Sequence, residues 1–385
     1  MKKYVFKKKR LIFLIIVFDF VGSLFAWPLK FLYPQKKPGT ISRILLIRLD
    51  HVGDVIMSTV VLRPLREAFP QARIDILVAD WAYDLVKNSP YLDTVIPFKP
   101  AWFDRERYPS LWTQIKDLRA LIKIIKKGDY DAAVDLKGDL RQIIALFLSR
   151  VTYRISYGIT GGGFLLSHNP EYRRGCHETD HNLDLVKELG VVIEKAKADL
   201  FVSVAAEKTA EKILKGNSIP ERFVVLHVLS GHNQKNWQNE KFSHLVRYMG
   251  VKKGLAVALI GTDREKKIVD DVIAAADIHA INLCGKTDLE TLAGVIKKAS
   301  LFVGIDSGPA HIAAACGVPA IILFSGTNDR HQWAPRGDLV RIMYPGDGKN
   351  LSSLDSESVF RVVDNMLDQT PLEGFHTGHL PSVKK

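Results

Sequence analysis

Hydrophobic residues in this chain fall into short continuous runs that alternate with stretches of helical spacing. In the first half, the apolar runs predict strands near residues 43–48, 73–78, 131–135 and 154–157. Helical periodicity there predicts helices at 54–69, 111–126, 139–149 and 182–189, with Pro64 expected to break or kink the first. Continuous apolar strands separated by helices are typical of parallel sheets that are covered on both faces.

A second alternating set begins near residue 223. Its strands are predicted in FVVLHV, LAVALIG, LFVGID and AIILF, and its helices at 240–250, 264–276, 288–298 and 309–316. The charged, weakly patterned stretch 191–220 is the expected boundary, and a helix near 355–368 is a candidate for crossing back to the first domain. We therefore predict an α/β protein with two Rossmann-like domains, 41–200 and 201–370, facing across a cleft, and a disordered tail at 371–385.

The N-terminus raises a membrane question. The segment LIFLIIVFDFVGSLFAWPL, residues 11–29, follows six basic residues among the first ten and is apolar except for Asp19. Its length suits a span of roughly 20 residues, but an acid at mid-span costs on the order of 3 kcal/mol. Basic residues beside a membrane span stay in the cytoplasm. A simple span after this basic N-terminus would therefore place the body of the chain on the far side of the membrane. We favour residues 1–40 as an inner-leaflet membrane anchor and linker, with an ordinary signal anchor as the alternative.

Composition narrows the class of protein. Three scattered cysteines, Cys176, Cys284 and Cys316, indicate a reducing compartment and no disulfide framework. Half of the net charge of +12 lies in the first ten residues, and the body has no arginine-glycine run and no aromatic-basic interleaving. Nucleic acid is therefore not an expected partner, and a small anionic ligand suits the body better.

One motif points to a metal site that the context does not support. HETDH at 177–181 matches the zinc-protease pattern, which works only inside a helix. Here Thr179 and Asp180 are expected to cap a helix that begins at Asn182. We therefore predict no metal site, and a loop or acceptor-side role for His177 and His181.

The strongest candidate site is VGIDSGPAHIAAACGVPAIILF, residues 303–324. It predicts a strand, a tight turn and a short helix, with Ser307 as cap and Pro309 in the first turn. Gly308 permits close approach of a ligand, and the N–H groups and positive helix end form an anion site at which His311 is aimed. The alternative is a helix that is merely well capped.

Three further positions follow second-domain strands. Lys235 in SGHNQKNW has the charge to neutralise a diphosphate, or is a solvated loop lysine. Glu265 in GTDREK is placed to accept from ribose hydroxyls, or caps the next helix with Asp263. Thr327 in SGTNDR gives a weaker signal for contact with the base.

The stretch ILLIRLDHVGDV, residues 44–55, predicts a buried strand, a loop and a helix start with a single glycine, Gly53. A dinucleotide loop has three spaced glycines. Asp54 is therefore either part of an altered cofactor loop, a helix cap or a catalytic acid, and His51 and Gly53 belong to an acceptor-side loop.

Taken in order, RLDHVGDVIMS, H…SGHNQKNW and DSGPAHIAAACGVP resemble glycosyltransferase family 9, the bacterial heptosyltransferases of lipopolysaccharide synthesis, over roughly residues 42–345. The resemblance implies the GT-B fold and inverting, metal-independent transfer, typically from ADP-heptose, with no cofactor. It implies Asp54 as catalytic base, Lys235 on donor phosphate, Ser307, Gly308 and His311 on the diphosphate, and Glu265 on ribose. HVLSG, NWQ and the hydrophobic N-terminus depart from the family pattern.

The expected function is transfer of a sugar onto a lipopolysaccharide-type or lipid-linked acceptor at the cytoplasmic face of the bacterial inner membrane. In that chemistry a carboxylate removes the acceptor proton, while positive charge and N–H donors hold the leaving diphosphate. Two alternatives remain: a nucleotide-sugar epimerase or hydrolase on the same fold, and a non-enzymatic nucleotide-binding membrane protein.

Overall fold

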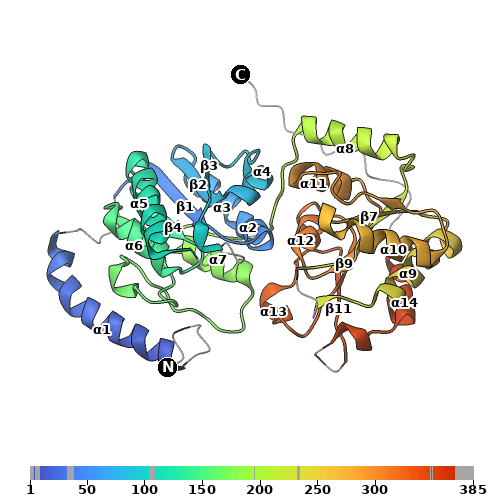
Figure 1. Cartoon of the computed structure of the whole chain (residues 1–385). Helices are drawn as coiled ribbons and strands as arrows, with labels where there is room; N and C mark the ends of the chain where they lie inside the picture. The colour runs from blue at the N-terminus through green and yellow to red at the C-terminus, as the bar shows by residue number, and fades with distance from the viewer. Residues whose placement is uncertain are drawn as a thin grey trace, which may run out of the picture.

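The computed structural model places two α/β domains side by side, preceded by a long helix (Figure 1). It describes residues 4, 9–32, 39–103, 109–194, 196–231, 235–346, 348 and 350–368, with only the backbone given at 9 and 26–32. The predicted linker at 33–40 lies mostly outside the described residues, and the tail at 371–385 lies wholly outside them.

The first domain is built on a five-stranded parallel sheet in the order β3-β2-β1-β4-β5. Alternate residues of β1 face opposite sides: Ile44 and Leu46 pack into one core cluster, and Leu45 and Ile47 into another. Helices cover both faces, which explains the unbroken apolar run. The strands are β1 (Arg43–Arg48), β2 (Arg73–Ala79), β3 (Thr94–Phe98), β4 (Ala132–Asp135) and β5 (Tyr153–Ser156). The helices are α2 (Val52–Ser58), α3 (Leu62–Ala68), α4 (Tyr83–Val86), α5 (Leu111–Gly128), α6 (Leu140–Leu148) and α7 (Glu178–Lys187).

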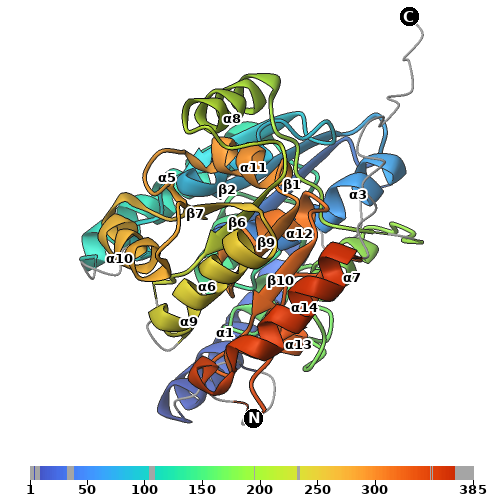
Figure 2. The same ribbon diagram turned by 90° about the vertical axis from the view of Figure 1, so that its right-hand side faces the viewer.

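The second domain has a six-stranded parallel sheet in the order β11-β10-β9-β6-β7-β8. Helices α8, α11 and α12 pack on one face and α9, α10 and α14 on the other (Figure 2). The strands are β6 (Phe223–His227), β7 (Ala256–Ile260), β8 (Ile281–Asn282), β9 (Leu301–Ile305), β10 (Ala320–Leu323) and β11 (Val340–Met343). The helices are α8 (Val204–Gly216), α9 (Asn239–Arg247), α10 (Lys266–Ala276), α11 (Leu289–Lys297), α12 (Gly308–Ala315), α13 (Arg330–Trp333) and α14 (Ser356–Asp368). The predicted fold class, two parallel-sheet domains, is confirmed.

Several element predictions need correction. The stretch 191–220, expected as the domain boundary and assigned no element, contains helix α8, capped at Ser203, whose hydroxyl accepts from the N–H of Ala206. Helix α14 does not cross back: Val359 and Val363 pack into the core of the second domain. The helix expected over 54–69 is divided as predicted, because a 3-10 turn at Thr59–Val61 separates α2 from α3, and Pro64 lies in the first turn of α3.

The N-terminal helix, α1 (Lys9–Leu32), lies along the outer edge of the first domain (Figure 1). It contacts the short turn Gly163–Leu165 between β5 and α7. Within the described part of the chain, none of the helices combines the length and apolar character that a membrane span requires. The anchoring role remains a prediction.

Candidate active site

The loop after β1 places Asp54 in a buried charge cluster. His51 is the N-cap of α2 and Asp54 is the third residue of its first turn, so the helix-cap interpretation of Asp54 is wrong. Asp54 Oδ1 lies 3.1 Å from the guanidinium of Arg48, which is only 1% exposed and also binds Glu178 Oε1 at 2.9 Å. Arg48 therefore joins β1, α2 and α7 beneath the loop. A buried charge is tolerated because opposite charges surround it.

The two acids of this loop, Asp50 and Asp54, have pKa values that are shifted in opposite directions. Burial, reinforced by the neighbouring Asp50 and then Glu178 and opposed by Arg48, raises the pKa of Asp54 to about 7. Burial alone would also raise the pKa of Asp50, but the positive charges of Arg48 and Lys137 lower that pKa below its usual range. Two carboxyls whose pKa values are pushed apart are characteristic of acid-base sites. Asp54 is thus suited to accept a proton near neutral pH.

Lys137 completes the first-domain side of the site. Its Nζ lies 3.1 Å from Asp50 Oδ2, just beyond the end of β4, and 4.2 Å from the centre of the Phe103 ring. The ring of His51 meets Phe103 edge-on at 5.6 Å. These contacts set the predicted acceptor-side loop beside a basic and aromatic surface. The sequence analysis did not single out Arg48, Lys137 or Glu178.

In the second domain, β9 leads into α12 as predicted, but Ser307 acts differently from the prediction. It occupies the N-cap position, yet its hydroxyl pairs with His227 Nδ1 at 3.0 Å and with the carbonyl of Ile305, and makes no cap bond to α12. Ser307 thus makes no side-chain cap bond to this helix end, and among the described residues no side chain is seen to accept from the Gly308 N–H. That arrangement favours the anion-site interpretation over a merely well-capped helix.

His311 and Gly53 meet across the domain boundary, and Figure 1 shows α2 and α12 facing one another there. A Cβ atom at Gly53 would lie 2.8 Å from Cδ2 of His311. One at Gly308 would lie 3.0 Å from Val52 Cγ1. The single glycine of the first loop therefore permits the close approach of a second-domain histidine. Burial lowers the pKa of His311 to about 4, so its ring is neutral at pH 7.

The other second-domain candidates lie at the same sheet edge or near it. Lys235 Nζ is 2.5 Å from Asp306 Oδ2, which also accepts from Asn328 Nδ2 at 3.1 Å. Lys235 is thus held by Asp306, the residue that precedes Ser307 in the sequence. The hydroxyl of Thr327 pairs with that of Ser325 at 2.7 Å, on the loop after β10.

Glu265 makes the capping contact that was its alternative interpretation. Its Oε2 accepts from the N–H of Thr262 at 2.6 Å and from the Thr262 hydroxyl at 2.9 Å. It stands just after β7, the neighbour of β6, so it remains at the carboxyl edge of the sheet. Contact with ribose stays a prediction.

The HETDH motif is helical after all, since α7 begins at Glu178 rather than at Asn182. His177 is the N-cap, with Nε2 2.7 Å from the carbonyl oxygen of Ala334 and Nδ1 2.8 Å from the Thr179 hydroxyl. His181 Nε2 lies 2.8 Å from the carbonyl oxygen of Arg173. The ring of His177 links α7 to the second domain and that of His181 links it to the preceding segment, and within the described residues there is no cluster suited to hold a metal ion.

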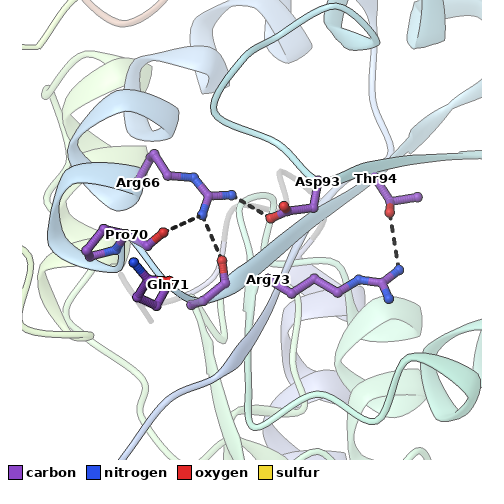
Figure 3. Close-up of a pocket in the computed structure, with 7 residues that line it drawn as sticks. Arg66, Pro70, Gln71, Arg73, Asp93 and Thr94 are labelled. Carbon is purple, nitrogen blue, oxygen red and sulfur yellow. Dashed lines mark hydrogen bonds and ion pairs between the residues drawn. The ribbon is translucent and has the colours of Figure 1, made fainter. Parts of the chain in front are cut away.

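A surface pocket of about 540 Å³ lies at the amino ends of β2 and β3, away from the sheet edge that carries these groups (Figure 3). Arg66 binds Asp93 at 2.5 Å and the carbonyl oxygen of Ala72 at 2.7 Å. Arg73 pairs with Asp75 at 3.0 Å. The arginines of this pocket are held by their own neighbours, so it is not a candidate active site.

Comparison with known proteins agrees with the geometry. The family model described as glycosyltransferase family 9 (heptosyltransferase) matches residues 118–361, more than half of the chain. The chain belongs to this family. Lipopolysaccharide heptosyltransferase 3 of Escherichia coli (strain K12) is 23% identical over 338 residues, covering 82% of this chain and 96% of the relative.

Solved structures of family 9 share the fold. The family 9 glycosyltransferase of Veillonella parvula superposes with a TM-score of 0.76 at 20% identity, over 86% of this chain and 98% of that one. Escherichia coli heptosyltransferase WaaC with ADP gives a TM-score of 0.68 at 19% identity, over 84% and 99%. The GT-B fold and the predicted family are confirmed, and the protein is a glycosyltransferase.

Proposed function

We propose that this enzyme transfers heptose from ADP-heptose to a lipopolysaccharide-type acceptor, with inversion, and with Asp54 as general base. The observation that carries the proposal is the position of Asp54, whose pKa is raised to about 7 where α2 faces the N-terminus of α12. The sugar is inferred from the relatives, which are named as heptosyltransferases.

The acceptor side supplies the base. Ionised Asp54 removes the proton of an acceptor hydroxyl as its oxygen attacks the anomeric carbon. Arg48 holds the carboxylate in place at 3.1 Å, and Lys137, which pairs with Asp50 at 3.1 Å, brings an ammonium group to the acceptor side. Attack from the side opposite the leaving group inverts the anomeric centre.

The donor side supplies the charge that the leaving ADP requires. The diphosphate is held by the N–H of Gly308 at the positive end of α12, by the neutral ring of His311 as a hydrogen-bond donor, and by Lys235. Asp306 positions Lys235 before the donor binds. Glu265 and Thr327 are assigned to the nucleoside, and ADP as the nucleotide is supported by the structural relative WaaC, which was solved with ADP.

The enzyme is further proposed to work at the cytoplasmic face of the bacterial inner membrane, where a lipid-anchored acceptor is available. The basic residues at the start of the chain suit an anionic lipid surface.

The deciding experiment measures donor binding and transfer separately. The full chain is titrated calorimetrically with ADP, UDP and GDP in the presence of a chelator, and ADP is expected to bind selectively. Asp54→Asn is expected to bind ADP as the wild type does but to lose transfer by on the order of 100-fold or more. Asp129→Asn, at an exposed acid paired with Arg43 on the same domain, is the control and keeps full activity.

Three outcomes would contradict the proposal. Equal loss of ADP binding and transfer in Asp54→Asn would remove the base assignment. Selective binding of UDP or GDP would change the donor. Consumption of the donor without any acceptor would instead favour the hydrolase or epimerase interpretation.

A further inference from the structure

Helix α1 is fastened to the first domain through the carboxylate of Asp19. Its Oδ1 accepts from the backbone N–H of Gly162 at 2.7 Å, and its Oδ2 accepts from the hydroxyl of Tyr4 at 2.7 Å. The ring of Phe18 packs against that of Phe164, with centres 5.6 Å apart. The acid that is so costly inside a bilayer is therefore only 9% exposed and fully engaged by protein donors.

The opposite face of α1 is a continuous apolar surface. Buried Ile15 and Asp19, four residues apart, mark the docked side. The outward side chains repeat at intervals of seven and four residues and are 42–73% exposed: Phe13, Leu14, Phe20, Val21, Leu24 and Phe25. Soluble monomers rarely leave so large an apolar patch uncovered, and such patches mark protein or membrane contacts.

The docked side of α1 is connected to the acceptor side of the first domain. The loop that receives Asp19 continues through Thr160, whose hydroxyl donates to the carbonyl of Gly138 at 2.6 Å and accepts from the N–H of Leu140 at 2.8 Å. That turn follows β4 and carries Lys137, which pairs with Asp50 beside the proposed base. A short chain of contacts thus connects α1 to the active-site edge of the first sheet.

We propose that α1 lies flat in an anionic bilayer while it stays docked through Asp19, and so holds the acceptor side of the cleft against the membrane. The occupant of the apolar face is lipid, because six basic residues lie within residues 2–10, directly before and at the start of the helix. Exposed aromatic and aliphatic side chains along the helix, directly after a basic cluster, suit a helix that lies in the membrane interface. The inference rests on the proposed function for the lipid-anchored nature of the acceptor.

A docked α1 and a membrane-spanning α1 predict different hydrogen bonding for the backbone N–H of Gly162. A helix that crosses the bilayer takes Asp19 away from the loop and leaves the Gly162 N–H without its carboxylate partner. A docked interfacial helix keeps that bond when the protein binds membrane. The exchange rate of the Gly162 amide therefore separates the two arrangements.

The first test is co-sedimentation of the full chain with phosphatidylethanolamine vesicles, with and without phosphatidylglycerol. Phe13→Ser/Phe20→Ser/Leu24→Ser is expected to weaken vesicle binding by about tenfold or more. The matched control, Val192→Ser/Val204→Ser/Val251→Ser, removes three apolar side chains that are 61–83% exposed elsewhere and is expected to bind as the wild type does. Omitting phosphatidylglycerol should weaken binding by a similar factor.

Calorimetric ADP binding by the same variants separates this inference from the proposed function, because α1 lies outside the donor site and the titration should not change. Unaltered vesicle binding by the α1 variant would overturn the inference. The inference would also be overturned if the wild type failed to bind vesicles and sedimented as a dimer that the α1 variant does not form. A second copy of the chain would then cover the apolar face.

The second test follows hydrogen exchange of the segment containing Gly162. Its amide is expected to stay equally protected in free and vesicle-bound wild type, and to lose protection in Asp19→Ala, which should still bind vesicles. Asp19→Ala should also transfer several-fold more slowly to a vesicle-embedded acceptor than the wild type, but at the same rate to a detergent-dispersed one. Faster exchange of Gly162 when the wild type binds vesicles would show that α1 leaves its dock, which contradicts the inference.

Discussion

At the scale of single residues, the proposed base depends on an arginine placed inside a strand. Arg48 ends β1 and is 1% exposed, and its guanidinium reaches Asp54 and Glu178 at 3.1 and 2.9 Å. Burial lowers the stability of the ionised Asp54, whereas Arg48 favours it. The balance between these effects, adjusted by Glu178, determines where Asp54 becomes ionised.

The pH dependence of transfer should report this balance. Because burial and nearby acids raise the pKa of Asp54 to about 7, kcat/KM is expected to rise with pH along a limb centred near 7. Glu178→Gln removes a negative charge that raises the pKa of Asp54 and frees Arg48 to act on Asp54. The midpoint of the limb should therefore fall by about one pH unit.

Asp184→Asn is the control, an acid on the same helix that pairs instead with Arg173 and Lys187. In Asp184→Asn the rising limb of kcat/KM against pH should keep the wild-type midpoint. A midpoint that stays near 7 in Glu178→Gln, or that moves upward, would show that Glu178 does not tune the base. Loss of activity without any change in the pH profile would indicate a structural effect only.

At the scale of elements, the site is formed where the N-termini of α2 and α12 meet. Each helix start carries a glycine opposite a side chain of the other: Gly53 faces His311, and Gly308 faces Val52. The His311 ring is 6% exposed and has little freedom to retreat. The separation of the base from the diphosphate donors is therefore set by the absence of a Cβ atom at Gly53.

Gly53→Ala should separate these helix ends without harming the fold. The new Cβ would lie 2.8 Å from His311 Cδ2, so α2 or α12 must shift. A displacement of that kind is expected to lower kcat/KM by on the order of 100-fold. Alanine is favoured over glycine within a helix by up to about 1 kcal/mol, so the melting temperature should stay level or rise.

Gly216→Ala at the end of α8, where an added Cβ meets nothing within 4 Å, is the matched control and should leave activity unchanged. Thermal melts and steady-state kinetics of both variants provide the measurement. Wild-type activity in Gly53→Ala would mean that the contact with His311 is not needed for transfer.

The elements show which features the sequence reveals. The sequence predicts strands with a continuous apolar run, such as residues 44–47 of β1 and the whole of β9, because strands buried on both faces must be largely hydrophobic. The edge strand β5 is predicted, but three other edge strands are missed: β3 (TVIPF) is half-buried and contains Pro97, β8 has two residues, and β11 is only partly buried. Helix α8 was missed because alanines, Ala206 and Ala210, supply much of its buried face, and they give little contrast in hydrophobicity.

The candidate site likewise contains residues that the sequence reveals and residues that it does not. The sequence singles out Asp54 and the turn at 307–311 as candidates because each follows a strand, where the local pattern predicts a helix start. Arg48 and Glu178 were not found, since their roles arise from contacts between segments 130 residues apart. No local signal distinguishes a charged residue that will be buried against a distant acid from one that will be solvated.

At the scale of the whole molecule, polar contacts bridge the two domains on both sides of the active site. Arg336 binds both carboxylate oxygens of Asp180, at 2.7 and 2.9 Å, close to α13. On the other side Glu290 pairs with Lys87 at 2.8 Å. Because Gly53 and His311 leave little space between α2 and α12, the domains must separate for substrates to enter and products to leave. These bridges therefore act on the balance between open and closed forms.

Arg336→Ala should shift that balance modestly toward the open form. The pair is half-exposed, with 52% and 36% of the two side chains accessible, so its contribution is about 0.5–1 kcal/mol rather than that of a buried pair. The closing equilibrium should therefore change by about two- to fivefold, with the donor KM rising by a similar factor. Added salt screens exposed pairs, so the difference between wild type and variant should shrink as ionic strength increases.

The control is Arg341→Ala, since the guanidinium of Arg341 contacts carbonyl oxygens of its own segment at Asp338 and Val340. X-ray scattering and donor titrations at low and high salt provide the measurement. A difference in KM that persists unchanged at high salt would exclude the ion pair as its cause and would point to the packing of Arg336 on α7.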